Sequence, residues 1–205
     1  MPSIKPWFTI LEPDEYLCMP WKNGLGETLE IHKHEDDQGL RYRISQAAVT
    51  DDGRFSDFSG LQRTLLLLRG QGMTLTLQEG SSVTQHELLQ PLDQASFDGG
   101  TLTDARLHGG PIDDLNIMVR ANDTLANVLS MTAPEICPIL SEAALLCGFY
   151  ALETATFAVT GDMTPSFVSV PKGGFIEFHG ASPVQLNSGR GAWIMIEKGR
   201  LDSRT

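Results

Sequence analysis

The fold of this chain is first indicated by residues 19–31, which read MPWKNGLGETLEI. A helix is disfavoured here, because proline lacks a backbone donor and each glycine costs about 1 kcal/mol relative to alanine. Polar and apolar residues then alternate from Thr28 to Ile31, which is the pattern of a half-buried strand. We therefore expect a tight loop leading into a strand, with glycines that let the backbone approach a ligand or a neighbouring strand. The alternative is a hairpin turn in which Trp21 has no particular role.

Strand patterns continue along most of the chain. Short alternating or apolar runs lie at residues 41–47, 63–68, 73–77, 156–159, 167–170, 174–178 and 192–196. Glycine-containing turn signals separate them about every ten residues, which favours a β-sandwich or small barrel over alternating strands and helices. The predicted fold class is therefore all-β, with only a few short helices at places such as residues 141–146.

The most plausible division of the chain lies near residues 122–138, where Pro134 and Pro138 interrupt the strand pattern. We expect two similar β-barrel halves, residues 1–121 and 122–205, that pack closely and are not joined by a flexible linker. A solenoid is not expected, because no repeat of about 20–50 residues is visible.

Composition argues against several classes of function. Twenty-six acidic and fifteen basic residues give a net charge of −11, so the average field repels nucleic acid and anionic lipid. The cysteines Cys18, Cys137 and Cys147 form no CxxC pair, which favours reduced thiols in the cytosol. The N-terminus lacks the apolar segment of a secretion signal, and no apolar run is long enough to span a bilayer. We expect a soluble cytoplasmic protein with neither nucleic-acid nor membrane partners.

Residues 51–64 contain the first candidate binding residue outside the opening loop. Phe55 and Phe58 are expected to hold this loop against the core. Arg63 stands at the entrance of an apolar strand, where burying an unpaired charge would be very costly. Its side chain must therefore point to solvent or pair with an anion.

A second polar set lies in residues 107–120. Strand alternation places Leu115, Ile117 and Val119 on one face and Asp114, Asn116, Met118 and Arg120 on the other. If the aliphatic residues face the core, the polar face lies either in water or inside a barrel. Inside a barrel, these side chains would form a directional binding set.

Together these segments resemble the HutD/Ves family, cupin-like proteins associated with bacterial histidine utilisation. The family pattern P-W-K-N-G-G-G-x-T-x-E-I is matched by residues 20–31, and W-R-x-S-x-A-x-V by residues 42–49. Residues 53–63 follow G-P-F-S-x-F-P-G-x-D-R, and residues 110–120 follow G-x-x-x-D-[LF]-N-x-M-x-R. These matches occur in the family's order within the N-terminal part of the chain, whereas the second half carries no motif of this kind.

The chain departs from these patterns at five positions. Leu25 stands where the pattern has a glycine, and Tyr42 where it has a tryptophan. Arg54 and Ser59 replace two prolines, and Gln62 replaces an aspartate. Leu25 and Gln62 are closest to the expected pocket, so the ligand of this chain could differ from that of its relatives.

The resemblance implies a bicupin fold of the RmlC-like jelly-roll type, with a pocket for a small carboxylate. It further implies a role in limiting histidine catabolism by binding an intermediate such as urocanate or N-formylglutamate. Arg43 and Arg63 would clamp the carboxylate, because a guanidinium matches that group with two hydrogen bonds. Trp21 would form an aromatic wall, and Lys22 or Asp114 would select the other end of the ligand. The complete expected binding set is Trp21, Lys22, Asn23, Arg43, Ser45, Arg63, His108, Asp114 and Asn116.

Neither a metal nor another cofactor is expected. His32 and His34 resemble the start of a metallocupin site, but they run directly into a charged turn at residues 36–39. The G-x-S-x-G and G-x-x-x-x-G-K-[ST] motifs are absent, so no catalytic residue is assigned. Two rivals to a non-catalytic binding protein remain: a cupin isomerase or hydrolase acting on a small organic acid, and an interaction protein with a polypeptide partner. A homodimer is left open.

Overall fold

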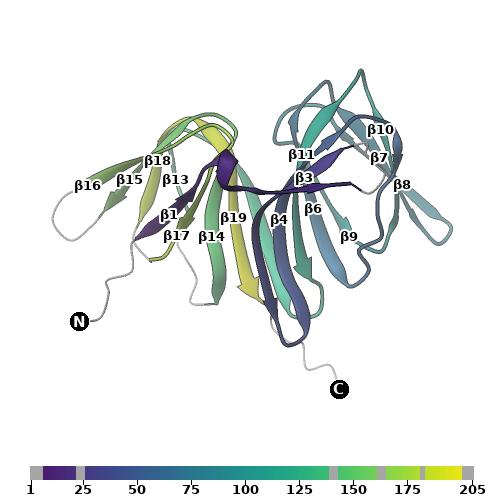
Figure 1. Cartoon of the computed structure of the whole chain (residues 1–205), viewed down its shortest axis with the longest axis horizontal. Coiled ribbons are helices and arrows are strands. Elements are labelled where there is room, and N and C mark those ends of the chain that lie inside the picture. Colours follow the sequence, from purple (N-terminus) through teal and green to yellow (C-terminus); the bar gives the residue numbers. More distant parts are fainter. Residues whose placement is uncertain (1–6, 22–25, 139–142, 161–164, 181–182, 200–205) are drawn as a thin grey trace. The chain divides into compact units, whose positions relative to one another are not determined.

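The computed structural model describes residues 7–21, 26–138, 143–160, 165–180 and 183–199. Strands and turns dominate these segments, and their single helical element is a short 3-10 turn, η1 (Pro13–Glu15) (Figure 1). The prediction of an all-β chain is confirmed. No helix within the segments described is long and apolar enough to cross a membrane.

The strands form two compact units. One, here the N-terminal unit, comprises the described residues of 17–125 together with residue 199. The other, the C-terminal unit, combines the described residues of 1–16 with those of 126–198. This division differs from the expected boundary at 121/122, because the first strand of the chain lies with the C-terminal strands.

The N-terminal unit contains two antiparallel sheets. The six-stranded sheet has the order β2 (Leu17–Pro20), β3 (Glu27–Asp36), β4 (Gly39–Val49), β11 (Ile112–Arg120), β6 (Leu61–Arg69) and β9 (Gln94–Asp98). The four-stranded sheet has the order β5 (Gly53–Arg54), β10 (Leu102–Leu107), β7 (Met73–Glu79) and β8 (Ser82–Leu88). The alternation seen in the sequence decides which side chains meet: Leu65 and Leu67 of β6 share a buried cluster with Met73 and Leu75 of β7.

The C-terminal unit is also built from two sheets. The first has the order β1 (Phe8–Leu11), β17 (Phe175–Phe178), β14 (Ala144–Ala151), β19 (Arg190–Lys198) and β12 (Thr124–Thr132). The second has the order β13 (Glu135–Ile136), β18 (Val184–Ser188), β15 (Ala155–Thr160) and β16 (Pro165–Val170). Residues 124 and 125 of β12 belong to the N-terminal unit. An aromatic chain marks the core, in which Phe157 packs edge-on against Phe149 and Phe178, with ring centroids 5.0 and 5.4 Å apart.

Two local expectations differ from the structure. Residues 8–11, assigned to the N-terminal half, pair in antiparallel register with β17, with Phe8 opposite Phe178. Residues 144–146 begin strand β14 and do not form the expected helix. Ala144 and Leu146 pair with Glu197 and Ile196 of β19, and this tertiary context overrides the helix preference of alanine and leucine.

Candidate functional site

A cavity of about 380 Å³ lies within the N-terminal unit. Strands β3, β4, β6 and β11 line it, together with the segment between β4 and β6, which carries most of the motif at residues 53–63. Its apolar lining comes from Trp21, Ala47, Val49, Phe55, Phe58 and Met118. Such a volume and mixed lining are typical of small-molecule sites.

Strand register explains why the motif residues meet at this cavity. Met118 of β11 lies opposite Arg43 of β4 on one side and Arg63 of β6 on the other. In the same way, Asn116 lies opposite Ser45. Directly paired residues of an antiparallel sheet project to the same face, so the two arginines flank Met118 in one row. The alternation of residues 107–120 therefore places Asn116 and Met118 at the cavity, where both side chains are buried.

The most distinctive feature of the cavity is a buried chain of three polar side chains. Arg63, Asn116 and Asp114 are only 6%, 4% and 1% exposed. The Nε atom of Arg63 donates to Oδ1 of Asn116 at 2.7 Å, and Nδ2 of Asn116 donates to Oδ1 of Asp114. The amide thus connects the guanidinium to the carboxyl group without a direct contact between them.

Aromatic rings fix the plane of the Arg63 guanidinium. Its central carbon lies 4.5 Å from the ring centroid of Phe55, and 5.9 and 5.4 Å from those of Phe58 and Phe97. Cation–π contacts of this kind stabilise a desolvated cation but leave its N–H groups free. Among the residues described, the terminal amines Nη1 and Nη2 have no hydrogen-bond acceptor. The Arg63 guanidinium therefore lines the cavity with two terminal amines that have no acceptor among the described residues.

Burial shifts both ionisable ends of this chain. Desolvation lowers the pKa of Arg63 to about 10, although nearby Asp114 opposes the change. Desolvation also raises the pKa of Asp114 to about 7, against the opposing effects of Arg63 and the Asn116 hydrogen bond. At neutral pH the guanidinium is charged, whereas the carboxyl group keeps its proton to a higher pH than an ordinary aspartate. The arrangement can hold a carboxylate bidentately and can also hold or release a proton.

Arg43 is not equivalent to Arg63, although both line the cavity. Nε of Arg43 lies 2.8 Å from Oε2 of Glu30, and its Nη2 contacts Sδ of Met19 at 3.9 Å. The charge of Arg43 is therefore already balanced by a carboxylate of the neighbouring strand. Sequence reasoning treated the two arginines alike and missed Glu30, although that residue is part of the first motif.

Other predicted residues are only partly brought together. Ser45 is buried at the cavity wall, and Trp21 lines the cavity while its Nε1 donates to Oγ1 of Thr28 at 2.8 Å. Lys22, Asn23 and Leu25 lie outside the described residues. His108 does not line the cavity; it is exposed, and its Nε2 lies 2.7 Å from Oγ1 of Thr74. The positive-φ glycines Gly109 and Gly110 turn the chain between His108 and β11. His108 therefore does not reach the cavity, although it is close in sequence to the motif at residues 110–120.

The aromatic residues of the motif at residues 53–63 contribute to the cavity, which the sequence analysis did not predict. Phe55 and Phe58 were expected only to hold a loop against the core. In the structure both line the cavity and contact the Arg63 guanidinium. The sequence signal that could have indicated this contact is that both phenylalanines share one motif with Arg63.

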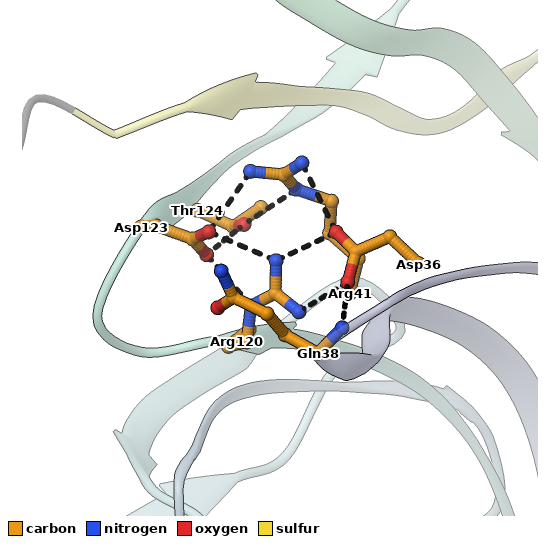
Figure 2. Close-up of polar contacts among 6 residues, drawn as sticks. All are labelled: Asp36, Gln38, Arg41, Arg120, Asp123 and Thr124. Atoms are coloured by element: carbon orange, nitrogen blue, oxygen red, sulfur yellow. Dashed lines mark hydrogen bonds and ion pairs between the residues drawn. The ribbon is translucent and has the colours of Figure 1, made fainter.

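Arg120, which shares its strand face with Asn116, belongs to a separate charge network (Figure 2). Its Nη1 and Nη2 donate to the two carboxylate oxygens of Asp36, each at 2.7 Å. Its Nε and Nη2 donate to Asp123 at 2.9 and 2.8 Å. Arg41 donates to the same two carboxylates and to Thr124. These hydrogen bonds lower the pKa of Asp36 and Asp123 and raise that of Arg120.

The network is closed, because every guanidinium nitrogen of Arg41 and Arg120 has an acceptor within it (Figure 2). It joins the tip of the β3–β4 hairpin to the turn between β11 and β12. We assign it a structural role in holding these turns together.

No group of three or more potential metal ligands occurs in the described part of the chain. His32 and His34 lie on β3, where their rings stack on Tyr42 of β4 with centroid distances of 5.6 Å each. These histidines thus take part in cross-strand packing.

Solved structures of cupin-like neighbours share the fold of this chain. The formate complex of oxalate decarboxylase from Lactobacillus farciminis aligns with a TM-score of 0.63 and 5% identity, covering 97% of this chain and 88% of that one. An identity this low supports the shared fold alone.

The family is identified more narrowly by sequence. The HutD family model matches residues 13–193, and the chain belongs to the HutD family. A structure of HutD from Pseudomonas fluorescens SBW25 aligns with a TM-score of 0.77 and 25% identity, covering 93% of this chain and 98% of that one. The resemblance predicted from the motifs is confirmed.

Curated relatives match about half of the chain. A 21.2 kDa protein from the hutC 3′ region of Pseudomonas putida is 36% identical over 111 residues, which cover 53% of this chain and 56% of that protein. Protein Ves from Citrobacter koseri is 36% identical over 112 residues, with the same coverage of 53% and 56%. The matched region thus spans little more than half the length of these relatives.

Proposed function

We propose that this chain is a bicupin that binds a small carboxylate in the cavity of its N-terminal unit, without converting it chemically. The observation that carries the proposal is the Arg63 guanidinium, which is buried against aromatic rings and keeps two terminal amines free of acceptors among the described residues. A buried cation with unused donors is stabilised by an anion, and the planar fork of arginine fits a carboxylate.

The cavity is larger than a carboxylate group alone requires. Its volume of about 380 Å³ leaves room for a body of several carbon atoms beyond the group held by Arg63. Trp21 offers an apolar wall for that body, whereas Asp51 and Asp52 offer acceptors for N–H groups. Lys22 and Asn23 remain part of the proposed site on sequence grounds.

The link of the family to histidine utilisation suggests which carboxylates to test first. We propose an intermediate such as urocanate or N-formylglutamate, and a role in adjusting histidine catabolism by sensing or sequestering it. Both compounds carry a carboxylate and at least one N–H group.

Thermal unfolding of the full chain tests this proposal directly. A ligand that binds only the folded state should stabilise it by about 2.7 kcal/mol at one hundred times its dissociation constant. Urocanate or N-formylglutamate should raise the melting temperature, and primary-amide analogues should do so far less because they lack the charge. The absence of a shift with either acid at millimolar concentration would contradict the ligand assignment.

A cupin enzyme is the second candidate, and Asp114 is the observation that favours it. A carboxyl group in a cavity with its pKa raised to about 7 has the property required of a general acid or base. Incubation of each acid with the protein, followed by chromatography of the mixture, separates the two functions. Product that accumulates with time and is lost in Asp114→Asn would favour the enzyme.

A further inference from the structure

We propose that the cavity binds its carboxylate ligand together with one proton, and that Asp114 holds this proton in the complex. The inference rests on the proposed function, since it concerns what happens when an anion reaches Arg63. It adds a consequence that binding alone does not require, namely net uptake of a proton from solvent.

The argument begins with the number of charges in the buried chain. Without ligand, Arg63 is a cation connected to Asp114 through the Asn116 amide. A ligand carboxylate on Nη1 and Nη2 would give one guanidinium two carboxylates. Two carboxylates that share one site raise each other's pKa, and one of them takes up a proton. Asp114 is the buried member of the pair, so the proton goes to Asp114.

Among the described residues, the other charged groups that line the cavity do not supply a second free cation. Arg43 is paired with Glu30 at 2.8 Å, and Arg54 with Asp104 at 3.2 Å. The remaining ionisable side chains of the lining are Asp51 and Asp52, which lie between β4 and β5. Both are acidic and disfavour an additional negative charge. Among the described residues, no histidine lines the cavity.

The adjacent residue Asp113 shows that the position of an aspartate along β11 decides whether it can hold this proton. Its carboxylate pairs with Arg69 at 2.7 Å, and Arg69 is largely exposed. Asp113 does not line the cavity, because adjacent residues of a strand point to opposite faces. Asp113 therefore provides a matched control for Asp114.

The pH range of the effect follows from the ligand-free state. Burial raises the pKa of Asp114 to about 7, so this group is mostly ionised at about pH 8.5 when the cavity is empty. A ligand anion raises that pKa further. Affinity should therefore increase as the pH falls toward about 7, and should level off below it, where Asp114 is protonated before binding.

Calorimetric titration with N-formyl-L-glutamate tests the inference, because the carboxylates of this compound stay ionised from about pH 6 to pH 9. At about pH 8, titrations in buffers with different ionisation enthalpies should report uptake approaching one proton per ligand. Affinity should rise at least several-fold between about pH 8.5 and pH 6.5. The Asp114→Asn variant should bind with little pH dependence and no proton uptake, whereas Asp113→Asn should behave like the unmodified chain.

Each outcome bears on a different statement. Binding of N-formylglutamate without proton exchange at about pH 8 would overturn the inference and leave the proposed function intact. Proton uptake that persists in a folded Asp114→Asn variant would assign the proton to another group. If neither N-formylglutamate nor urocanate binds at any pH, the proposed function fails, and the inference fails with it.

Discussion

Replacing Asp114 with asparagine should change how the stability of the ligand-free chain depends on pH. The carboxyl is 1% exposed, and Oδ1 accepts a hydrogen bond from Asn116 that an asparagine carbonyl can also accept. The substitution thus removes the titration while keeping the shape and this contact. A variant of this kind separates the effect of a proton from the effect of packing.

The size of the change follows from the difference between the folded and unfolded states. Burial raises the pKa of Asp114 from its ordinary value of 3.8 to about 7. From about pH 5.5 to pH 7 the folded chain therefore keeps a proton that the unfolded chain has already lost. Each pH unit with a one-proton difference changes the free energy of unfolding by about 1.4 kcal/mol, so the interval amounts to about 2 kcal/mol. Because the folded state binds the extra proton, stability falls as the pH rises and stops falling above about pH 7.

Urea unfolding at about pH 5.5 and pH 8, followed by circular dichroism and tryptophan fluorescence, measures this difference. The loss of stability between the two pH values should be about 2 kcal/mol greater in the unmodified chain than in Asp114→Asn. Asp113→Asn should keep the pH dependence of the unmodified chain, since its carboxylate pairs with Arg69 away from the cavity. Equal pH dependence in the unmodified chain and Asp114→Asn would refute the assignment of a raised pKa to Asp114.

Three further predictions concern binding, the charge network and metal. Arg63→Lys should weaken carboxylate binding by about 1.5–3 kcal/mol in calorimetry, whereas Arg43→Lys should have a smaller effect because Arg43 is already paired with Glu30; equal losses would contradict this ranking. Arg120→Lys should lower the melting temperature near neutral pH. The difference should shrink as the pH falls below about 4, because the unfolded chain then binds protons that the network carboxylates, with their lowered pKa values, bind only at lower pH; an unchanged melting temperature would argue against a structural network. Chelator treatment should leave both melting temperature and carboxylate affinity unchanged, and a loss of either that added metal reverses would demonstrate a metal site.

Much of the site could be predicted because it depends on local alternation. The two-residue period of a strand places Asp114, Asn116 and Met118 on one face whatever the partner strands are. A role for Arg63 could also be predicted locally, since an isolated charge at the start of an apolar strand needs either solvent or an anion. What the local pattern left open was whether the polar face meets water or an interior, and the burial of Asp114 decides this in favour of an interior.

The features that could not be predicted depend on partners distant in sequence. Residues 8–11 are four ordinary strand residues, and nothing in their composition specifies that they pair with β17. Residues 144–146 contain good helix formers, but pairing with the distant strand β19 outweighs a propensity worth only tenths of a kcal/mol per residue. The inequality of Arg43 and Arg63 has the same origin, because it depends on Glu30 being placed beside Arg43 by the β3–β4 register.

Arg63 and Arg120 illustrate how one residue type in one sheet can serve two purposes. Both are less than 10% exposed, and both lie on strands of the six-stranded sheet. Arg120 meets two carboxylates, one of them 84 residues away in sequence, and each of its three guanidinium nitrogens has an acceptor. Arg63 meets one amide oxygen and three aromatic rings, which hold its plane without satisfying Nη1 and Nη2. Because Arg63 lines a cavity and these amines have no acceptor among the described residues, the fold retains at Arg63 a capacity for an anion that it has already filled at Arg120.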